Sequence, residues 1–85
     1  MKSIYDSRYG LLMKILKEYR LNSNMTQQEL AVLLDTDQTY VSKYESGLRR
    51  LDVIETRSIC NTLGINFIDF ANELENRIKE EHLDD

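Results

Sequence analysis

The apolar residues of this chain recur every three or four positions along five separate stretches, and that spacing predicts five helices. The first stretch runs from about Asp6 or Ser7 to about Arg20. Its inward face is predicted to hold Leu11, Leu12, Ile15, Leu16 and Tyr19. The 85 residues contain no proline, their three glycines are widely spaced, and alternation of β-branched residues is scarce. We therefore expect a single all-α domain spanning residues 1–85.

Two short helices separated by a tight turn are predicted next. Thr26 followed by Glu29 is a capping-box pattern that begins the first of them, and Asp37 is a good N-cap for the second. Asp35 tolerates the positive φ that such a turn requires, and Gly47 suits the left-handed position after the second helix. The residues expected to face inward are Leu30, Ala31, Leu33 and Leu34, then Val41 and Tyr44.

Two further capping patterns begin the fourth and fifth helices. Asp52 with Glu55 is a second capping box, and the helix that it begins ends at Gly64. Its inward stripe is predicted to hold Val53, Thr56, Ile59, Cys60 and Leu63. Asn66 caps a fifth helix over about 66–81, whose apolar residues are Phe67, Phe70, Ala71, Leu74 and Ile78. We expect the charged tail, residues 80–85, to fray.

Short residue patterns across most of the chain match those of a known family. They are Thr26-Gln27, Glu29-Leu30-Ala31, Gln38-Thr39, Val41-Ser42-Lys43 and Glu45-x-Gly47, continuing into Arg49-Arg50-Leu51-Asp52 and Asn61-Thr62-Leu63-Gly64-Ile65. The stretch of about 26–46 resembles the helix-turn-helix of the phage-repressor family, the Cro/cI-type or XRE-like regulators. The family usually has glycine where this chain has Asp35, and serine or threonine where it has Asp37.

The resemblance covers about residues 11–70 and places the motif at its usual position in an order of five helices. It implies a five-helix lambda-repressor-like DNA-binding domain, here with an extended C-terminal helix. Such a domain binds double-stranded DNA and regulates transcription. We expect a repressor that binds a pseudo-palindromic operator as a homodimer.

The polar face of the helix after Asp37 holds the candidate base-reading residues Gln38, Thr39, Ser42 and Lys43. In a helix-turn-helix this helix lies in the major groove with its N-terminal residues against base edges. The amide of Gln38 can pair with N6 and N7 of adenine, and Lys43 can reach O6 and N7 of guanine. Thr39 offers a hydroxyl and a methyl group, and Ser42 offers a hydroxyl.

Contacts to phosphates, which fix register rather than sequence, are expected from Gln27, Tyr40, Ser46, Arg49, Arg50 and Arg20. The alternative for Tyr40 is half-buried packing. The resemblance also implies an ion pair between Arg20 and Glu45, for which the alternative is a solvated arginine on the surface. The ion pair and a phosphate contact by Arg20 would be compatible.

The fifth helix continues for two turns beyond the end of a minimal domain of this family, so Leu74 and Ile78 would lack a core to enter. We interpret Phe67, Phe70, Leu74 and Ile78 as a two-fold dimer interface. The alternative is that this helix folds back on the first helix and completes the core of one chain. In a dimer, the two reading helices would lie about 34 Å apart, which is one turn of DNA.

The charge of the chain is unevenly distributed. The net charge is −4, whereas nucleic-acid binders are usually basic. Residues 66–85 carry −5, so the remaining residues 1–65 carry +1. The acidity therefore lies mostly in the tail, away from the proposed reading helix. We expect modest non-specific affinity for DNA and a shallow dependence on salt.

The sequence lacks the residues that catalysis or metal binding would need. Cys60 and His82 are the sole cysteine and histidine, too few for a zinc site, and His82 lies in the acidic tail with no nucleophile beside it. There is also no phosphate-binding glycine loop. We expect no enzyme activity, no metal and no cofactor. A single cysteine and the lack of a membrane-length apolar run lead us to expect a cytoplasmic protein.

Two other functional classes are compatible with the same residues. An antitoxin-like protein would share the DNA-binding domain and use the acidic fifth helix and tail to hold a basic protein partner. A protein-interaction module would keep the fold without binding DNA, in agreement with the net charge of −4. A toxin reading frame beside the gene would favour the first class, and failure to bind DNA at low salt would favour the second.

Overall fold

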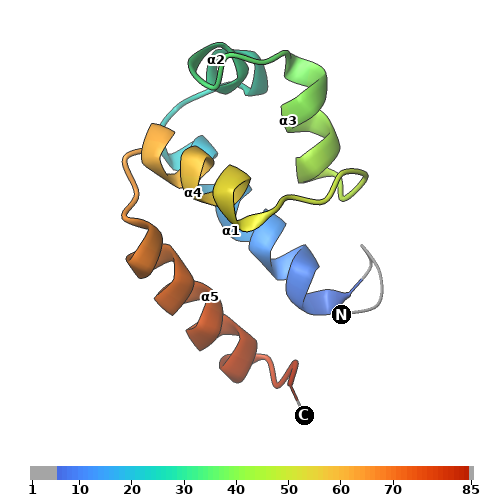
Figure 1. Ribbon diagram of the computed structural model, residues 1–85. Helices are drawn as coiled ribbons and strands as arrows, with labels where there is room; N and C mark the ends of the chain where they lie inside the picture. The colour runs from blue at the N-terminus through green and yellow to red at the C-terminus, as the bar shows by residue number, and fades with distance from the viewer. Residues whose placement is uncertain (1–5, 85) are drawn as a thin grey trace.

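The computed structural model describes residues 6–84, and within this range it contains five helices and no strand. The helices are α1 (Ser7–Asn22), α2 (Gln27–Leu33), α3 (Gln38–Glu45), α4 (Val53–Thr62) and α5 (Phe67–Glu80). Figure 1 shows α2 and α3 at one end of the molecule, while α5 runs beside α1 toward the other end. The predicted all-α fold and its order of five helices are confirmed.

The helices begin at the caps that the sequence predicts. Oγ1 of Thr26 accepts from the N–H of Glu29 at 3.0 Å, and the Glu29 carboxylate accepts from the N–H of Thr26 at 2.8 Å. Asp52 and Glu55 form the same reciprocal pair, at 2.7 and 3.0 Å. Each box satisfies backbone N–H groups that a helix terminus otherwise leaves unpaired. The remaining N-caps are Asp6, Asp37 and Asn66.

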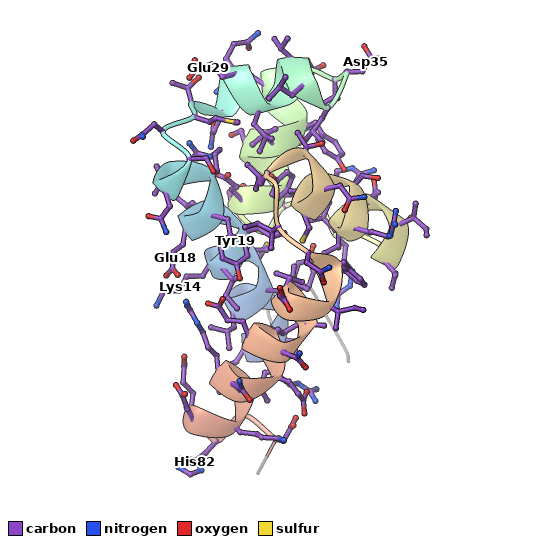
Figure 2. The ribbon with its side chains drawn as sticks, turned by 90° about the vertical axis from the view of Figure 1, so that its left-hand side faces the viewer. Lys14, Glu18, Tyr19, Glu29, Asp35 and His82 are labelled. Carbon is purple, nitrogen blue, oxygen red and sulfur yellow. The ribbon has the colours of Figure 1, made fainter. Side chains whose placement is uncertain are left out.

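All five helices end in the same backbone motif, in which a residue with positive φ is followed by a residue whose N–H bonds back to a carbonyl five positions earlier. The positive-φ residues are Asn24, Asp35, Gly47, Gly64 and His82. Asp35 and His82 lie at opposite ends of the molecule in Figure 2. Because L side chains disfavour this region, the three non-glycine residues are held there against an intrinsic cost.

The last of these motifs orders the chain beyond α5. After His82 the chain turns back, and Leu83 packs half-buried against the core. Oδ1 of Asp84 then accepts from Nη1 of Arg8 at 3.1 Å. The expectation that the tail frays is therefore wrong for residues 81–84, because a half-buried leucine and an ion pair hold them; residue 85 lies outside the described residues.

The core draws on every helix. Its most deeply buried side chains are Ile15, Leu16, Leu30, Ala31, Val41, Tyr44, Ile59, Cys60 and Phe70. Two residues expected to face inward are exposed: Leu33 by 57% and Val53 by 67%. Leu33 lies about 110° around α2 from the centre of its buried face, at 100° per residue. Val53 lies in the first turn of α4, at the rim of the core.

The contact between α5 and α1 corrects part of the expected dimer interface. Phe70 and Ile78 are 2% and 8% exposed and belong to the core of a single chain. The ring of Phe70 meets the ring of Tyr19 edge-on, with centroids 6.2 Å apart. These two residues thus follow the fold-back alternative, since α5 packs on α1. Phe67 and Leu74 are only half-buried.

A polar cluster along the same contact fastens α5 to α1. Nη2 of Arg77 donates to Glu18 at 2.9 Å and to Glu73 at 2.6 Å, and the Tyr19 hydroxyl also donates to Glu73. Figure 2 shows Glu18 and Tyr19 on the part of α1 that borders α5. The hydrogen bond from Arg77 holds the pKa of the Glu18 carboxyl below its usual value. α5 is therefore held by both apolar and ionic contacts.

Candidate nucleic-acid interface

The polar face of α3 is presented by a helix whose other face is locked in the core. Val41 and Tyr44 have no exposed surface, and the Asp37 side chain caps the helix by accepting from the N–H of Tyr40 at 3.1 Å. Three of the four candidate base-reading residues, Gln38, Thr39 and Lys43, are exposed, and Ser42 is half-buried. The four side chains thus belong to one short helix with a fixed orientation.

Behind this helix lies the ion pair between Arg20 and Glu45. Nε of Arg20 lies 2.7 Å from Oε2 of Glu45, and Nη2 lies 3.0 Å from Oε1. Their side chains are 7% and 3% exposed. Nη1 of Arg20 donates to the Met25 carbonyl at 2.7 Å, so each guanidinium nitrogen is engaged. The hydrogen bond to Glu45 raises the pKa of Arg20. The predicted phosphate contact by Arg20 is therefore wrong, because the side chain is buried behind α3 and each of its nitrogens already donates to the protein.

A chain of hydrogen bonds connects this buried pair to the surface. Oε1 of Glu45 accepts from Nε2 of Gln27 at 3.0 Å. Oε1 of Gln27 in turn accepts from Nε2 of Gln38, also at 3.0 Å. An amide has two N–H donors and an oxygen with two lone pairs, so Gln38 keeps one N–H and its oxygen for another ligand. The side-chain orientation of Gln38, the first candidate base reader, is thereby held by a chain of hydrogen bonds that starts at the buried ion pair.

Arg49 lies in the loop after α3 and contacts two side chains of the domain. Its Nη1 is 2.8 Å from Oε2 of Glu55, and its guanidinium carbon is 4.7 Å from the ring centroid of Tyr40. The Tyr40 hydroxyl donates to the same Glu55 oxygen at 3.1 Å. Burial, reinforced by Glu55, raises the pKa of Tyr40 to about 12. Tyr40 thus takes the half-buried position of the alternative interpretation rather than an open phosphate-binding one.

The other candidate phosphate contacts lie near the two ends of α3. Ser46 is exposed, and its hydroxyl donates to the Lys43 carbonyl at 3.1 Å. Arg50 is half-buried, with its guanidinium carbon 4.3 Å from the ring centroid of Tyr9 in α1. Gln27 is half-buried at the start of α2, beside Gln38. Gln27 therefore lies near the start of α3, whereas Ser46 and Arg50 follow its end.

Two residues of this site, Tyr9 and Glu55, were not predicted from the sequence. The sequence assigns Glu55 only to a capping box, although its second oxygen holds Arg49 and Tyr40. The backbone N–H of Asp52 contributes most to lowering the pKa of Glu55, and the Arg49 and Tyr40 contacts add to it. Tyr9 precedes the first predicted core leucine by two positions and contacts residues forty positions later. Local spacing carries no signal for such contacts.

A mostly apolar groove, which Tyr9 and Arg50 also line, lies between α1, α5 and the start of α4. Its lining includes Leu12, Val53, Phe67, Ala71 and Leu74. The groove continues between α1 and α5 toward Ile78. Two members of the predicted dimer interface, Phe67 and Leu74, thus line this groove instead of forming an isolated stripe.

The described residues hold no cluster of metal-ligating side chains and no helix able to span a membrane. Within residues 6–84, no three histidine, cysteine or acidic side chains lie close enough together to hold a metal ion. Burial raises the pKa of the Cys60 thiol to about 11, which disfavours its reactive thiolate. Among the same residues, no helix has the length and apolar character needed to cross a membrane.

Comparisons with known proteins place this geometry in a family. The family described as Helix-turn-helix matches residues 16–70. Control protein C.MunI of Mycoplasma sp is 28% identical over 68 residues, which cover 80% of this chain and 89% of that protein. The uncharacterized HTH-type transcriptional regulator YqaF of Bacillus subtilis (strain 168) is 30% identical over 74 residues, covering 87% and 97% respectively.

A solved structure agrees with both relatives. The XRE-family like protein from Pseudomonas syringae pv. tomato str. DC3000 is 39% identical and superposes with a TM-score of 0.81. The match covers 87% of this chain and 90% of that one. On sequence and structure together, the chain belongs to the XRE-like helix-turn-helix family of DNA-binding transcriptional regulators.

Proposed function

We propose that this protein is a repressor that binds a pseudo-palindromic DNA operator as a homodimer and reads its bases with α3. The observation that carries the proposal is the hydrogen-bonded chain from the buried Arg20–Glu45 pair through Gln27 to Gln38. A surface glutamine ordinarily samples several rotamers, and fixing it has an entropic cost. When the side chain is already ordered in the folded protein, that entropy is lost during folding and not on binding. The interaction with a base then contributes more of its energy to affinity.

Gln38 is the principal base reader in this proposal. Its free N–H and its oxygen match N7 and N6 of an adenine in the major groove, and such a bidentate pair discriminates by about 1–3 kcal/mol. Lys43 lies five residues later on α3 and is exposed, so it reaches a second base, with guanine preferred. Thr39 and Ser42 supply hydroxyl groups between them.

Four residues supply phosphate contacts around these readers. Gln27 flanks the start of α3, whereas Ser46, Arg49 and Arg50 follow its end. Each cationic contact releases counterions, and the observed binding constant falls with salt by about 0.9 in log–log slope per neutralised phosphate. With two arginines per subunit and a net charge of −4, the dependence on salt is shallow and binding is strongest at low salt.

The homodimer part of the proposal rests on the groove between α1 and α5. Its apolar lining includes Phe67 and Leu74, and Val53 at its rim is 67% exposed. Burial of apolar surface contributes about 25 cal/mol per Å², and a domain of this size benefits from a partner. A second copy of this chain therefore covers the apolar part of the groove, away from its border at Arg50. Bound across an operator, such a dimer represses by excluding other proteins from the same DNA.

Selection from a randomised pool of duplex DNA at low salt tests this function. The wild-type chain should enrich a two-fold symmetric site, and Gln38→Ala should lose the preference at one base position in each half-site. Gln28→Ala is the matched control, because Gln28 is exposed on α2 but belongs to no part of the hydrogen-bonded chain described above. Enrichment of a single asymmetric site would contradict the dimer, and no enrichment would contradict sequence-specific binding altogether.

A further inference from the structure

We infer that Tyr9 is a positioning residue for DNA binding, because it holds the loop that carries Arg50 in two ways. Its hydroxyl holds the backbone of the loop, and its ring holds the side chain of Arg50. This inference rests on the proposed function, since it assigns a role in the contact between that loop and DNA phosphates. Tyr9 itself is 4% exposed, so it acts through Arg50 and not by touching DNA.

The hydroxyl of Tyr9 joins two backbone groups on either side of Arg50. It donates to the carbonyl of Arg49 at 3.1 Å and accepts from the N–H of Leu51 at 2.7 Å. A tyrosine hydroxyl has one donor hydrogen and can accept as well, so both bonds can form at once. The residues before and after Arg50 are therefore tied to one buried atom of α1.

The ring of Tyr9 supports the side chain of the same arginine. The guanidinium carbon of Arg50 lies 4.3 Å from the ring centroid, within the range of a cation–π contact. A planar guanidinium that stacks on an aromatic face is held in one orientation, and its fork of N–H donors suits the geometry of a phosphate. Tyr9 thus restrains the backbone position and the side-chain plane of Arg50 together.

The adjacent arginine has an analogous support from another element. Arg49 lies over the ring of Tyr40 and is paired with Glu55 in α4. The two neighbouring arginines are therefore held by different tyrosines, one from α1 and one from α3.

The test measures binding of a random-sequence DNA duplex of about 20 base pairs across a range of salt concentrations. Tyr9→Phe keeps the ring and removes both hydrogen bonds. It should weaken binding by about two- to tenfold, the range for one net hydrogen bond. Arg50→Ala should lower the salt slope by about 0.9 per subunit, the value for one phosphate contact. In an Arg50→Ala background, Tyr9→Phe should change affinity by less than about twofold, since the group that it positions is gone.

Two controls separate positioning from stability. Tyr19→Phe removes a tyrosine hydroxyl from the same helix, on the side that faces Glu73, and should leave DNA affinity and salt slope unchanged. Hydrogen exchange of the Leu51 amide should be faster in folded Tyr9→Phe, which reports loss of the hydrogen bond directly. Arg50→Lys keeps the charge but loses the planar stack on Tyr9, so it should weaken binding. Because this variant leaves Tyr9 in place, it tests the contact even if Tyr9 variants fold poorly.

The outcomes distinguish this inference from the proposed function. If the wild-type chain binds no duplex at low salt, both are overturned. If it binds but Tyr9→Phe has no effect, or has an equal effect with and without Arg50, then Tyr9 is only a core residue. Normal binding and an unchanged salt slope in Arg50→Ala would also overturn the inference while leaving the proposed function intact.

Discussion

Glu45→Gln removes one charge from the buried ion pair while keeping the size and shape of the side chain. In the wild type, two contacts of 2.7 and 3.0 Å join Arg20 to Glu45, and the side chains are only 7% and 3% exposed. The variant places an amide N–H group against a guanidinium that can only donate hydrogen bonds. The positive charge of Arg20 is then left without a counter-charge in a site that water barely reaches.

The expected cost follows from this burial. Removing one partner of a buried pair typically lowers the free energy of unfolding by about 3–5 kcal/mol. Each kcal/mol lowers the Tm of a domain of this size by about 4–8 °C, so we expect a fall of at least about 12 °C. Denaturant titration followed by circular dichroism measures the first quantity, and a thermal scan measures the second.

A matched substitution on the surface gives the control. Glu75→Gln disrupts the pair between Glu75 and Lys79, which is 3.8 Å apart with side chains 58% and 70% exposed. This change should cost less than about 1 kcal/mol. Equal losses in the two variants would refute the reasoning, because they would mean that burial does not set the value of the Arg20–Glu45 pair.

Three further predictions concern the fold. Asp35→Gly should raise the free energy of unfolding by about 0.5–1 kcal/mol, because glycine adopts φ of +57° without steric cost; a chemical denaturation curve checks this. Tyr44→Phe should leave stability unchanged or raise it, since the buried hydroxyl makes no hydrogen bond within residues 6–84; a loss above about 1 kcal/mol would contradict this. Stability should fall as pH drops from about 4.5 to about 2, because hydrogen bonds hold the pKa values of Glu55 and Asp6 below their unfolded values, that of Asp6 at about 2. The ionised carboxylates therefore stabilise the fold at neutral pH, and this contribution is lost when they are protonated. Urea midpoints measured across this pH range check the prediction.

Local signals in the sequence were sufficient for the helices and their ends. The reciprocal caps at Thr26 and Asp52 depend on residues three positions apart, so spacing alone identifies them. The left-handed turns at Asp35 and Gly47 likewise follow from residue type. The reading helix could be placed because its polar face and its two buried residues alternate with the helical period.

Contacts between distant segments could not be derived in this way. Whether Phe70 and Ile78 bury against α1 or against another chain depends on the direction of the chain after Gly64, which the helical period does not encode. The same limit applies to Tyr9, because its hydroxyl meets a loop forty residues away. The ion pair of Arg20 and Glu45 was implied only by family resemblance. Its burial, which local spacing does not predict, excludes the phosphate contact that Arg20 was expected to make.

Discrimination at a single base pair tests the central claim most directly. The affinities of the wild type and of Gln38→Ala should be measured for the selected operator and for a duplex in which one adenine–thymine pair of each half-site is changed. The wild type should lose about 1–3 kcal/mol per half-site on the changed duplex, whereas Gln38→Ala should bind both duplexes equally. If both proteins lose the same affinity on the changed duplex, Gln38 does not read that base, and the role assigned to its chain of hydrogen bonds is wrong.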